Sequence, residues 1–180
     1  MINNIVLQGM KNDLTWEVIG ITLCDYPVFF EPSIISWGIP DNWGSAAVVY
    51  ALIEGLAGVK DNGIAFEKAL LAPRWAASDV QNVTTTVKYE ASGGYVSYNY
   101  SYETEDNLIK ILYTGNADTI NLKVMLPENT SAINLNVNGT QVPLSVLKIE
   151  NSKYVEFTSL ATGVYEAIIK LKRDYPTVPK

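Results

Sequence analysis

One stretch of the chain is hydrophobic on nearly every side if it folds as a helix. It spans Asn42–Gly58 (NWGSAAVVYALIEGLAG), and only Glu54 and Gly55 interrupt its apolar centre. A helix without a polar face has to be covered by other structure on most of its sides. Gly58 suits the left-handed conformation that commonly ends a helix. The sequence therefore predicts a buried helix over residues 43–58.

Beyond about residue 64 the pattern changes to an alternation of polar and apolar residues, which is typical of β-strands. Asn138-Gly139 is a strong hairpin signal, because a type I′ turn needs a positive φ at both positions. Pro143 marks an edge strand or a bulge. Short strands joined by Gly, Asn and Asp turns predict an antiparallel β-sandwich. The expected strands span residues 83–89, 95–102, 108–114, 120–125, 133–137, 141–148, 153–158 and 163–172.

These two patterns divide the chain at about residue 63. Residues 1–63 are expected to form an irregular N-terminal segment, rich in aromatic residues and proline, that contains the buried helix. Residues 64–180 are expected to form the β-sandwich, although 64–73 (IAFEKALLAP) fits either a short helix or a strand. The predicted fold class is mainly β, and an apolar fraction of 48% is enough for a real core.

The composition excludes several kinds of function. The chain has no His and one Cys, so we expect no metal site, no cofactor and no His-based catalysis. A net charge of −6 with 13 Lys and Arg residues argues against binding to nucleic acid or to an anionic membrane. We recognise no signal peptide and no transmembrane segment, and the compartment is left open.

Glu31 and Asp41 are the candidate catalytic residues. Hydrolysis of a glycoside uses two carboxylates, and apolar surroundings raise the pKa of the one that acts as the acid. Both residues lie in a part of the sequence that also contains Trp37 and Trp43, whose ring faces suit stacking on a sugar. The commoner roles for such residues are a helix cap for Asp41 and core packing for the aromatic side chains.

A tyrosine stripe is the second candidate. Tyr98, Tyr100 and Tyr102 fall on one face of an expected strand, and with Trp37 and Trp43 they are the candidate carbohydrate-binding residues. Tyrosine is also favoured in strands because it packs against neighbouring strands, and this structural role is the commoner one.

Three segments carry a resemblance to a known group of enzymes. They are DNWGSAAVVYALIEGLAGVKDNGIAF (41–66), LLAPRW (70–75) and TINLKVMLPENTSAINLNVNG (119–139). This order resembles the C-terminal end of glycoside hydrolases and phosphorylases built on an (α/α)6 barrel, alpha-L-rhamnosidase-like enzymes included, where a β-sandwich follows the last barrel helix. The rhamnosidase-like enzymes commonly have a His just before that helix, whereas this chain has Asp41, Asn42 and Trp43. The barrel carries the acid and the base in that group, so the resemblance implies that most catalytic residues lie outside this chain.

Three hypotheses of function follow. The first is a non-catalytic C-terminal β-sandwich module of a glycoside-hydrolase-like protein, with a structural or carbohydrate-associated role. The second is a free-standing carbohydrate-binding or cell-surface interaction domain, and the third is a small glycosidase that uses Glu31 and Asp41. The expected partners are a carbohydrate and, over helix 43–58, either a second copy of the chain or an upstream helical domain. A periplasmic or extracellular location would follow if the chain is part of a longer secreted enzyme.

Overall fold

The computed structural model describes residues 43–174. Contacts within the chain divide it into two compact units, which span Met1–Gly55 and Leu56–Lys180. The second unit therefore begins before residue 64, where the sequence pattern placed the start of the sandwich. The reason is that residues 59–61 already form a strand of its sheet.

The apolar stretch forms a helix of two kinds. The α-helix α3 spans Trp43–Tyr50, and the π-helical segment η2 continues it over Ala51–Leu56. No residue of η2 is buried within the described residues. Val49, Tyr50 and Leu52 have exposed fractions of 52%, 61% and 46%. The helix that the sequence predicts over residues 43–58 is thus present over residues 43–56.

Gly58 lies between the end of the helix and the first strand of the second unit. Gly58 has a φ of +70°, as the sequence predicted for the end of this helix. Its carbonyl accepts a 2.7 Å hydrogen bond from the backbone N–H of Ala72, and the neighbouring Val59 is buried. A Cβ atom at position 58 would lie 1.8 Å from the Ala72 oxygen. Only glycine fits this position without movement of the backbone.

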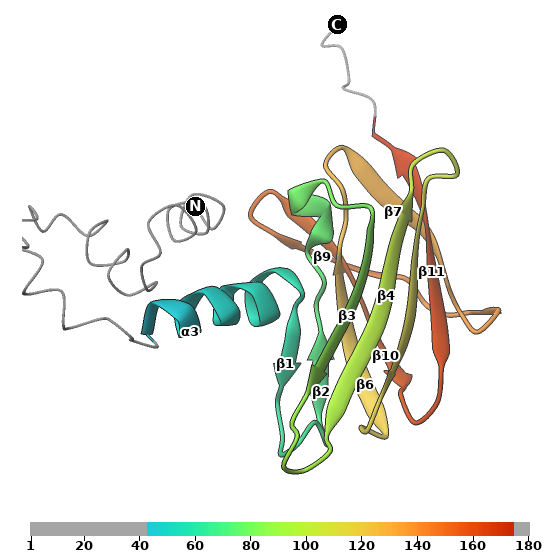
Figure 1. Cartoon of the computed structure of the whole chain (residues 1–180). Coiled ribbons are helices and arrows are strands. Elements are labelled where there is room, and N and C mark those ends of the chain that lie inside the picture. The colour runs from blue at the N-terminus through green and yellow to red at the C-terminus, as the bar shows by residue number, and fades with distance from the viewer. Residues whose placement is uncertain (1–42, 175–180) are drawn as a thin grey trace, which may run out of the picture. The chain divides into compact units, whose positions relative to one another are not determined.

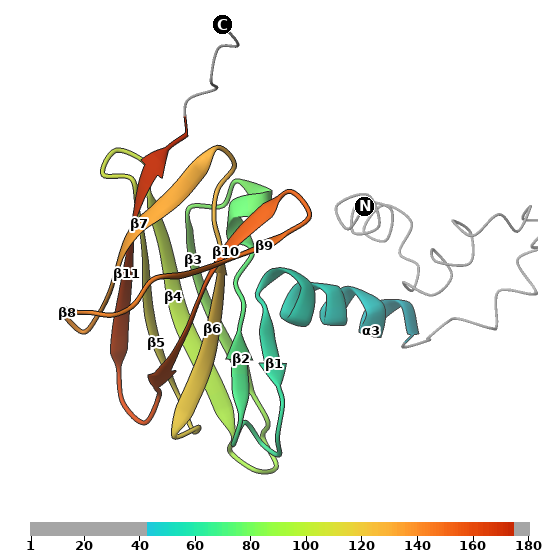
Figure 2. The same ribbon diagram turned by 180° about the vertical axis from the view of Figure 1, so that it is seen from behind.

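The second unit is a sandwich of two sheets (Figures 1 and 2). Within residues 43–174, every strand pairing is antiparallel except that of β2 with β6, which is parallel. The mainly β fold class is therefore confirmed. The five-stranded sheet has the order β1 (Val59–Asp61), β2 (Ala69–Leu71), β6 (Thr119–Met125), β10 (Ser152–Leu160) and β9 (Ser145–Ile149). The six-stranded sheet has the order β3 (Asn82–Lys88), β4 (Tyr95–Glu103), β5 (Leu108–Gly115), β11 (Tyr165–Arg173), β7 (Thr130–Val137) and β8 (Thr140–Gln141).

Alternate residues of the central strands form the core between the sheets. Successive side chains of a strand point to opposite faces, so one apolar residue in every two is enough to fill the interior. The residues that are almost fully buried come from both sheets, and they include Ile109, Ile111, Ile120, Leu122, Val124, Leu135, Val155, Ala167 and Ile169.

Two local signals in the sequence set the path of the chain from β7 to β9. Asn138 and Gly139 have φ values of +48° and +77°, as a type I′ turn between β7 and β8 requires. The strand expected over 141–148 is two strands, β8 and β9, which belong to different sheets. Pro143 lies between them, and its missing N–H explains why pairing stops there. The ambiguous segment 64–73 contributes the strand β2.

Gly58 and Gly139 both have a positive φ, so a comparison of the two tests how tightly Gly58 packs against Ala72. We expect Gly139→Ala to lower the free energy of unfolding by about 1 kcal/mol, because its φ is positive but no atom lies within 4 Å of the added Cβ. Gly58→Ala should cost distinctly more, because it adds a clash with the Ala72 carbonyl. Urea unfolding of both variants measures the difference, and equal losses would show that Gly58 is not tightly packed.

Candidate functional site

Most of the candidate residues from the N-terminal part of the sequence cannot be placed. Glu31, Trp37 and Asp41 lie outside the described residues. Trp43 is the first residue of α3, and its side chain is also outside what the structure describes. The hypothesis of a two-carboxylate site at Glu31 and Asp41 therefore stays a prediction.

Two of the three stripe tyrosines are core residues. Tyr98 and Tyr100 have exposed fractions of 2% and 0%, because they lie on the inward face of β4. Both side chains thus pack in the core of the sandwich, which is the structural role that the sequence analysis gave as the commoner one. The Tyr98 hydroxyl accepts a 2.6 Å hydrogen bond from Trp75 Nε1 and donates one of 2.8 Å to the Ala57 carbonyl.

Burial raises the pKa values of both tyrosines, since an ionised phenol would lose its contact with water. Their hydrogen bonding differs, however. The hydroxyl of Tyr98 is paired in both directions, whereas that of Tyr100 has no hydrogen-bond partner among the described residues. The interior thus holds one satisfied phenol and one unsatisfied phenol on the same strand.

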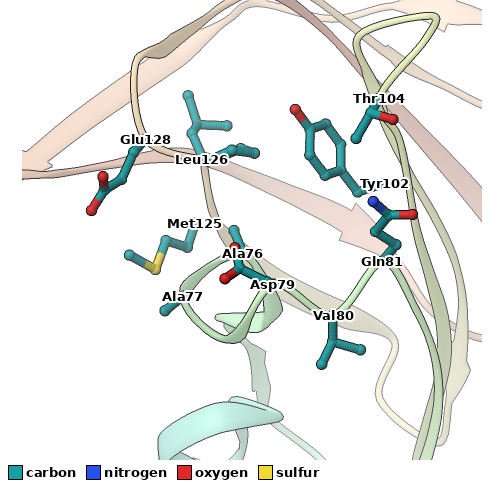
Figure 3. A pocket seen from close by; sticks show the side chains of 11 residues that line it. Ala76, Ala77, Asp79, Val80, Gln81, Tyr102, Thr104, Met125, Leu126 and Glu128 are labelled. Atoms are coloured by element: carbon teal, nitrogen blue, oxygen red, sulfur yellow. The ribbon is translucent and has the colours of Figure 1, made fainter.

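Tyr102, the third tyrosine of the stripe, lines a hollow at one end of the sandwich. This main hollow has a volume of about 510 Å³. Figure 3 shows Glu128 and Met125 on one side of it, and Tyr102, Thr104 and Gln81 on the other. The remaining lining residues are Ala76, Ala77, Asp79, Val80, Leu126 and Pro127.

Backbone hydrogen bonds hold the walls of the main hollow. The short 3-10 helix η3 spans Trp75–Ser78 and ends at Asp79 in the left-handed conformation, which turns the chain towards β3. The N–H of Tyr102 donates to the Gln81 carbonyl at 2.7 Å. On the opposite wall the N–H of Leu126 donates to the Lys153 carbonyl at 2.9 Å. Each wall is therefore tied to a strand of the sandwich.

A second, smaller hollow continues the first. Its volume is about 320 Å³, and it shares Tyr102 and Glu128 with the main hollow. The other lining residues are Asn129, Thr130, Arg173 and Asp174. We call this one the side hollow, and the two hollows together the end groove.

Asp174, which lines the side hollow, forms an ion pair with Lys153. Lys153 Nζ lies 2.6 Å from Asp174 Oδ2 and also donates to Ser131 Oγ at 2.9 Å. The Ser131 hydroxyl donates to the same carboxylate at 2.7 Å. Hydrogen bonding by Lys153 and Ser131 lowers the pKa of Asp174, because both contacts favour the charged carboxylate. This cluster fastens the end of β11 to both sheets.

The polar side chains of the main hollow, unlike the Asp174 cluster, are not paired with other side chains of the described residues. Asp79, Gln81, Thr104 and Glu128 make no side-chain hydrogen bond or ion pair within residues 43–174. Asp79 and Glu128 are also exposed. They therefore lack the apolar enclosure that the acid of a glycosidase needs, but they are available to accept hydrogen bonds from a ligand.

The sequence analysis identified only Tyr102 of the end groove. The other residues come from η3 and the segment after it, the ends of β4, β6 and β11, and the turn before β7, which are far apart in the chain. Residues in turns follow no period of two, so the pattern that reveals strands cannot reveal them. The signal in the sequence that came nearest to the groove was the turn over residues 127–130, which lies within the segment 119–139 that carries the resemblance to glycoside hydrolases.

Comparisons with known proteins give a limited likeness. No protein-family model and no curated protein matches the chain. Among solved structures, a GH127 beta-L-arabinofuranosidase from Geobacillus stearothermophilus T6 has 12% sequence identity and a TM-score of 0.43, over 72% of this chain and 18% of that one. A structure titled glycoside hydrolase has 14% identity and a TM-score of 0.43, over 82% of this chain and 23% of that one. The chain thus spans about a fifth of the length of these structures.

Between residues 43 and 174, no helix has the length and apolar character needed to cross a membrane.

The two buried tyrosines allow a matched test of the core. Tyr98→Phe leaves the Trp75 N–H and the Ala57 carbonyl without their buried partner, so we expect a loss of about 1–3 kcal/mol in unfolding free energy. Tyr100→Phe removes a hydroxyl that has no hydrogen-bond partner within residues 43–174, so stability should stay the same or rise. Urea unfolding measures both changes. A larger loss of unfolding free energy in Tyr100→Phe than in Tyr98→Phe would contradict the view that Tyr98 is the hydrogen-bonded hydroxyl of the two.

The Asp174 cluster predicts a dependence of stability on pH. A carboxylate with a lowered pKa stabilises the fold above its unfolded-state pKa, and this contribution is lost as the pH falls through the folded-state pKa. Asp174→Asn should therefore unfold at a lower urea concentration than the wild type at pH 7. The difference should shrink as the pH falls below the ordinary aspartate value of about 3.9. Asp106→Asn, in an exposed turn, is the control, and an equal effect there would refute the prediction.

Proposed function

We propose that the chain is a non-catalytic β-sandwich module of a larger, glycoside-hydrolase-like protein. The observation that carries this proposal is the apolar helix that precedes the sandwich. Val49, Tyr50 and Leu52 are exposed within the described residues. An exposed apolar surface of this kind usually marks an interface, so a further structure is needed to cover the helix.

The exposed apolar residues lie on more than one side of the helix. This distribution favours a helical domain of the same protein as the structure that covers them. Consecutive residues of an α-helix are about 100° apart, so the exposed neighbours Val49 and Tyr50 project in different directions around the axis. A second copy of the chain would cover one side of the helix at a flat contact. Neighbouring helices of one domain cover several sides, as in the helical barrels that the sequence resembles.

The sandwich itself supports a role without catalysis. Glycoside hydrolysis requires a carboxylic acid that keeps its proton until it is needed, which apolar surroundings achieve. The two carboxylates that line the main hollow, Asp79 and Glu128, are exposed. The acid and base are therefore proposed to lie in the helical domain, and this chain supports it.

The size and activity of the native protein test this proposal. An antibody to this 19.8 kDa chain should detect a band several times larger in the source organism. The protein captured by that antibody should release nitrophenol from at least one aryl glycoside, whereas the purified 180-residue chain should release none.

Each result can contradict a separate part of the proposal. A native band near 20 kDa would overturn the larger protein. A large protein that is inactive on the whole glycoside panel would overturn the carbohydrate-active assignment. Hydrolysis by the purified chain would overturn its non-catalytic role and direct attention to Glu31 and Asp41.

A further inference from the structure

We infer that the end groove binds a neutral saccharide chain. This names a ligand for a site that the proposed function does not use. The inference rests on the proposed function only for its setting in a carbohydrate-active protein. Its physical basis is the shape, the lining, the charge and the rigidity of the groove.

The shape of the groove fits an extended ligand. The main hollow, of about 510 Å³, is within the range of roughly 300–1,000 Å³ that small-molecule sites occupy. The side hollow adds about 320 Å³ beyond Tyr102 and Glu128, which border both. A ligand that fills both hollows must extend along these two side chains, which line both. A chain of linked rings meets this requirement better than a single compact molecule.

The lining has the two kinds of surface that a sugar presents. The apolar side chains of Val80, which is exposed, and Met125, which is half-buried, can contact ring C–H groups. The ring of Tyr102 adds an aromatic surface with a polar hydroxyl at its tip. The unpaired side chains of Gln81, Thr104, Asp79 and Glu128 supply acceptors and donors for sugar hydroxyls.

The charges of the main hollow select against anionic ligands. Asp79 and Glu128 are its charged lining residues, and no Lys or Arg of the described chain lines it. An anionic sugar would be repelled there, whereas the hydroxyls of a neutral sugar can donate to both carboxylates. In the side hollow, Arg173 is exposed and can donate to hydroxyls of the continuing chain.

The backbone around the groove favours a saccharide over a peptide. Peptides commonly bind by adding a strand to a row of unpaired backbone groups. Here the Gln81 carbonyl accepts from Tyr102, the Leu126 N–H donates to Lys153, and the Asn129 carbonyl accepts from the N–H of Asp174. These backbone groups are already paired, so recognition falls to side chains. The same bonds fix the walls, which limits the entropy lost on binding.

Affinity electrophoresis tests the inference with defined probes. The purified chain is run in gels that contain soluble arabinan, xylan, galactan or β-glucan, with polygalacturonate as the anionic comparison. We expect at least one neutral polysaccharide to retard the wild type, and polygalacturonate to retard it less. Titration with an oligosaccharide from the retarding polysaccharide then gives the affinity.

Variants of exposed residues locate the binding site. Gln81→Ala and Glu128→Gln should each weaken binding by about tenfold or more, since each removes a hydrogen bond or a charged acceptor. Their matched controls are Gln141→Ala on β8 and Glu67→Gln in the turn between β1 and β2, which should bind as the wild type does. Tyr102→Ala should lose more affinity than Tyr102→Phe, which keeps the ring.

Three outcomes would overturn the inference. They are no retardation by any neutral polysaccharide, stronger retardation by polygalacturonate, and groove variants that bind as tightly as their controls. The variants at positions 81 and 128 are exposed, so a folding defect in Tyr102→Ala would not obscure the result. The size of the native protein is measured separately, so failure here leaves the proposed module intact.

Discussion

The fold depends on a buried chain of hydrogen bonds that joins three parts of the sandwich. Trp75 Nε1 donates to the Tyr98 hydroxyl, which donates to the Ala57 carbonyl. Ala57 lies where the chain enters the sandwich, Tyr98 lies on a central strand, and Trp75 begins the short helix η3 that borders the main hollow. Buried polar groups are costly unless they are paired, so these three parts are held in one arrangement. The position of the groove wall is therefore set from inside the core.

The sequence predicted the strands well because their signals are local. Alternation of apolar residues locates β4 and β5, and Asn138-Gly139 fixes the turn after β7. The end groove could not be predicted in the same way. Its lining combines η3 with the turn before β7 and the end of β11, and only the sheet topology brings these segments together. A short-range pattern contains no information about such neighbours.

The tyrosine stripe shows why a residue type alone does not assign a role. Tyr98, Tyr100 and Tyr102 have the same spacing and the same chemistry, and yet the first two are sealed between the sheets. Tyr102 stands near the end of β4, where the sandwich opens, and its ring reaches the hollow. The position along the strand, rather than the face of the strand, separates packing from exposure. This position becomes visible only when the opposite sheet is in place.

The exposure of Asp79 and Glu128 bears on the proposed binding of a saccharide in the end groove. A carboxylate in an open groove stays well solvated and can accept hydrogen bonds from a sugar at little cost. Enclosure of the same carboxylate would prepare it to act as an acid, but it would also destabilise the charged form that accepts hydroxyl groups. The openness around Asp79 and Glu128 therefore favours reversible binding over bond cleavage. In the module that we propose, the end groove would hold a carbohydrate chain while the chemistry takes place in the proposed helical domain.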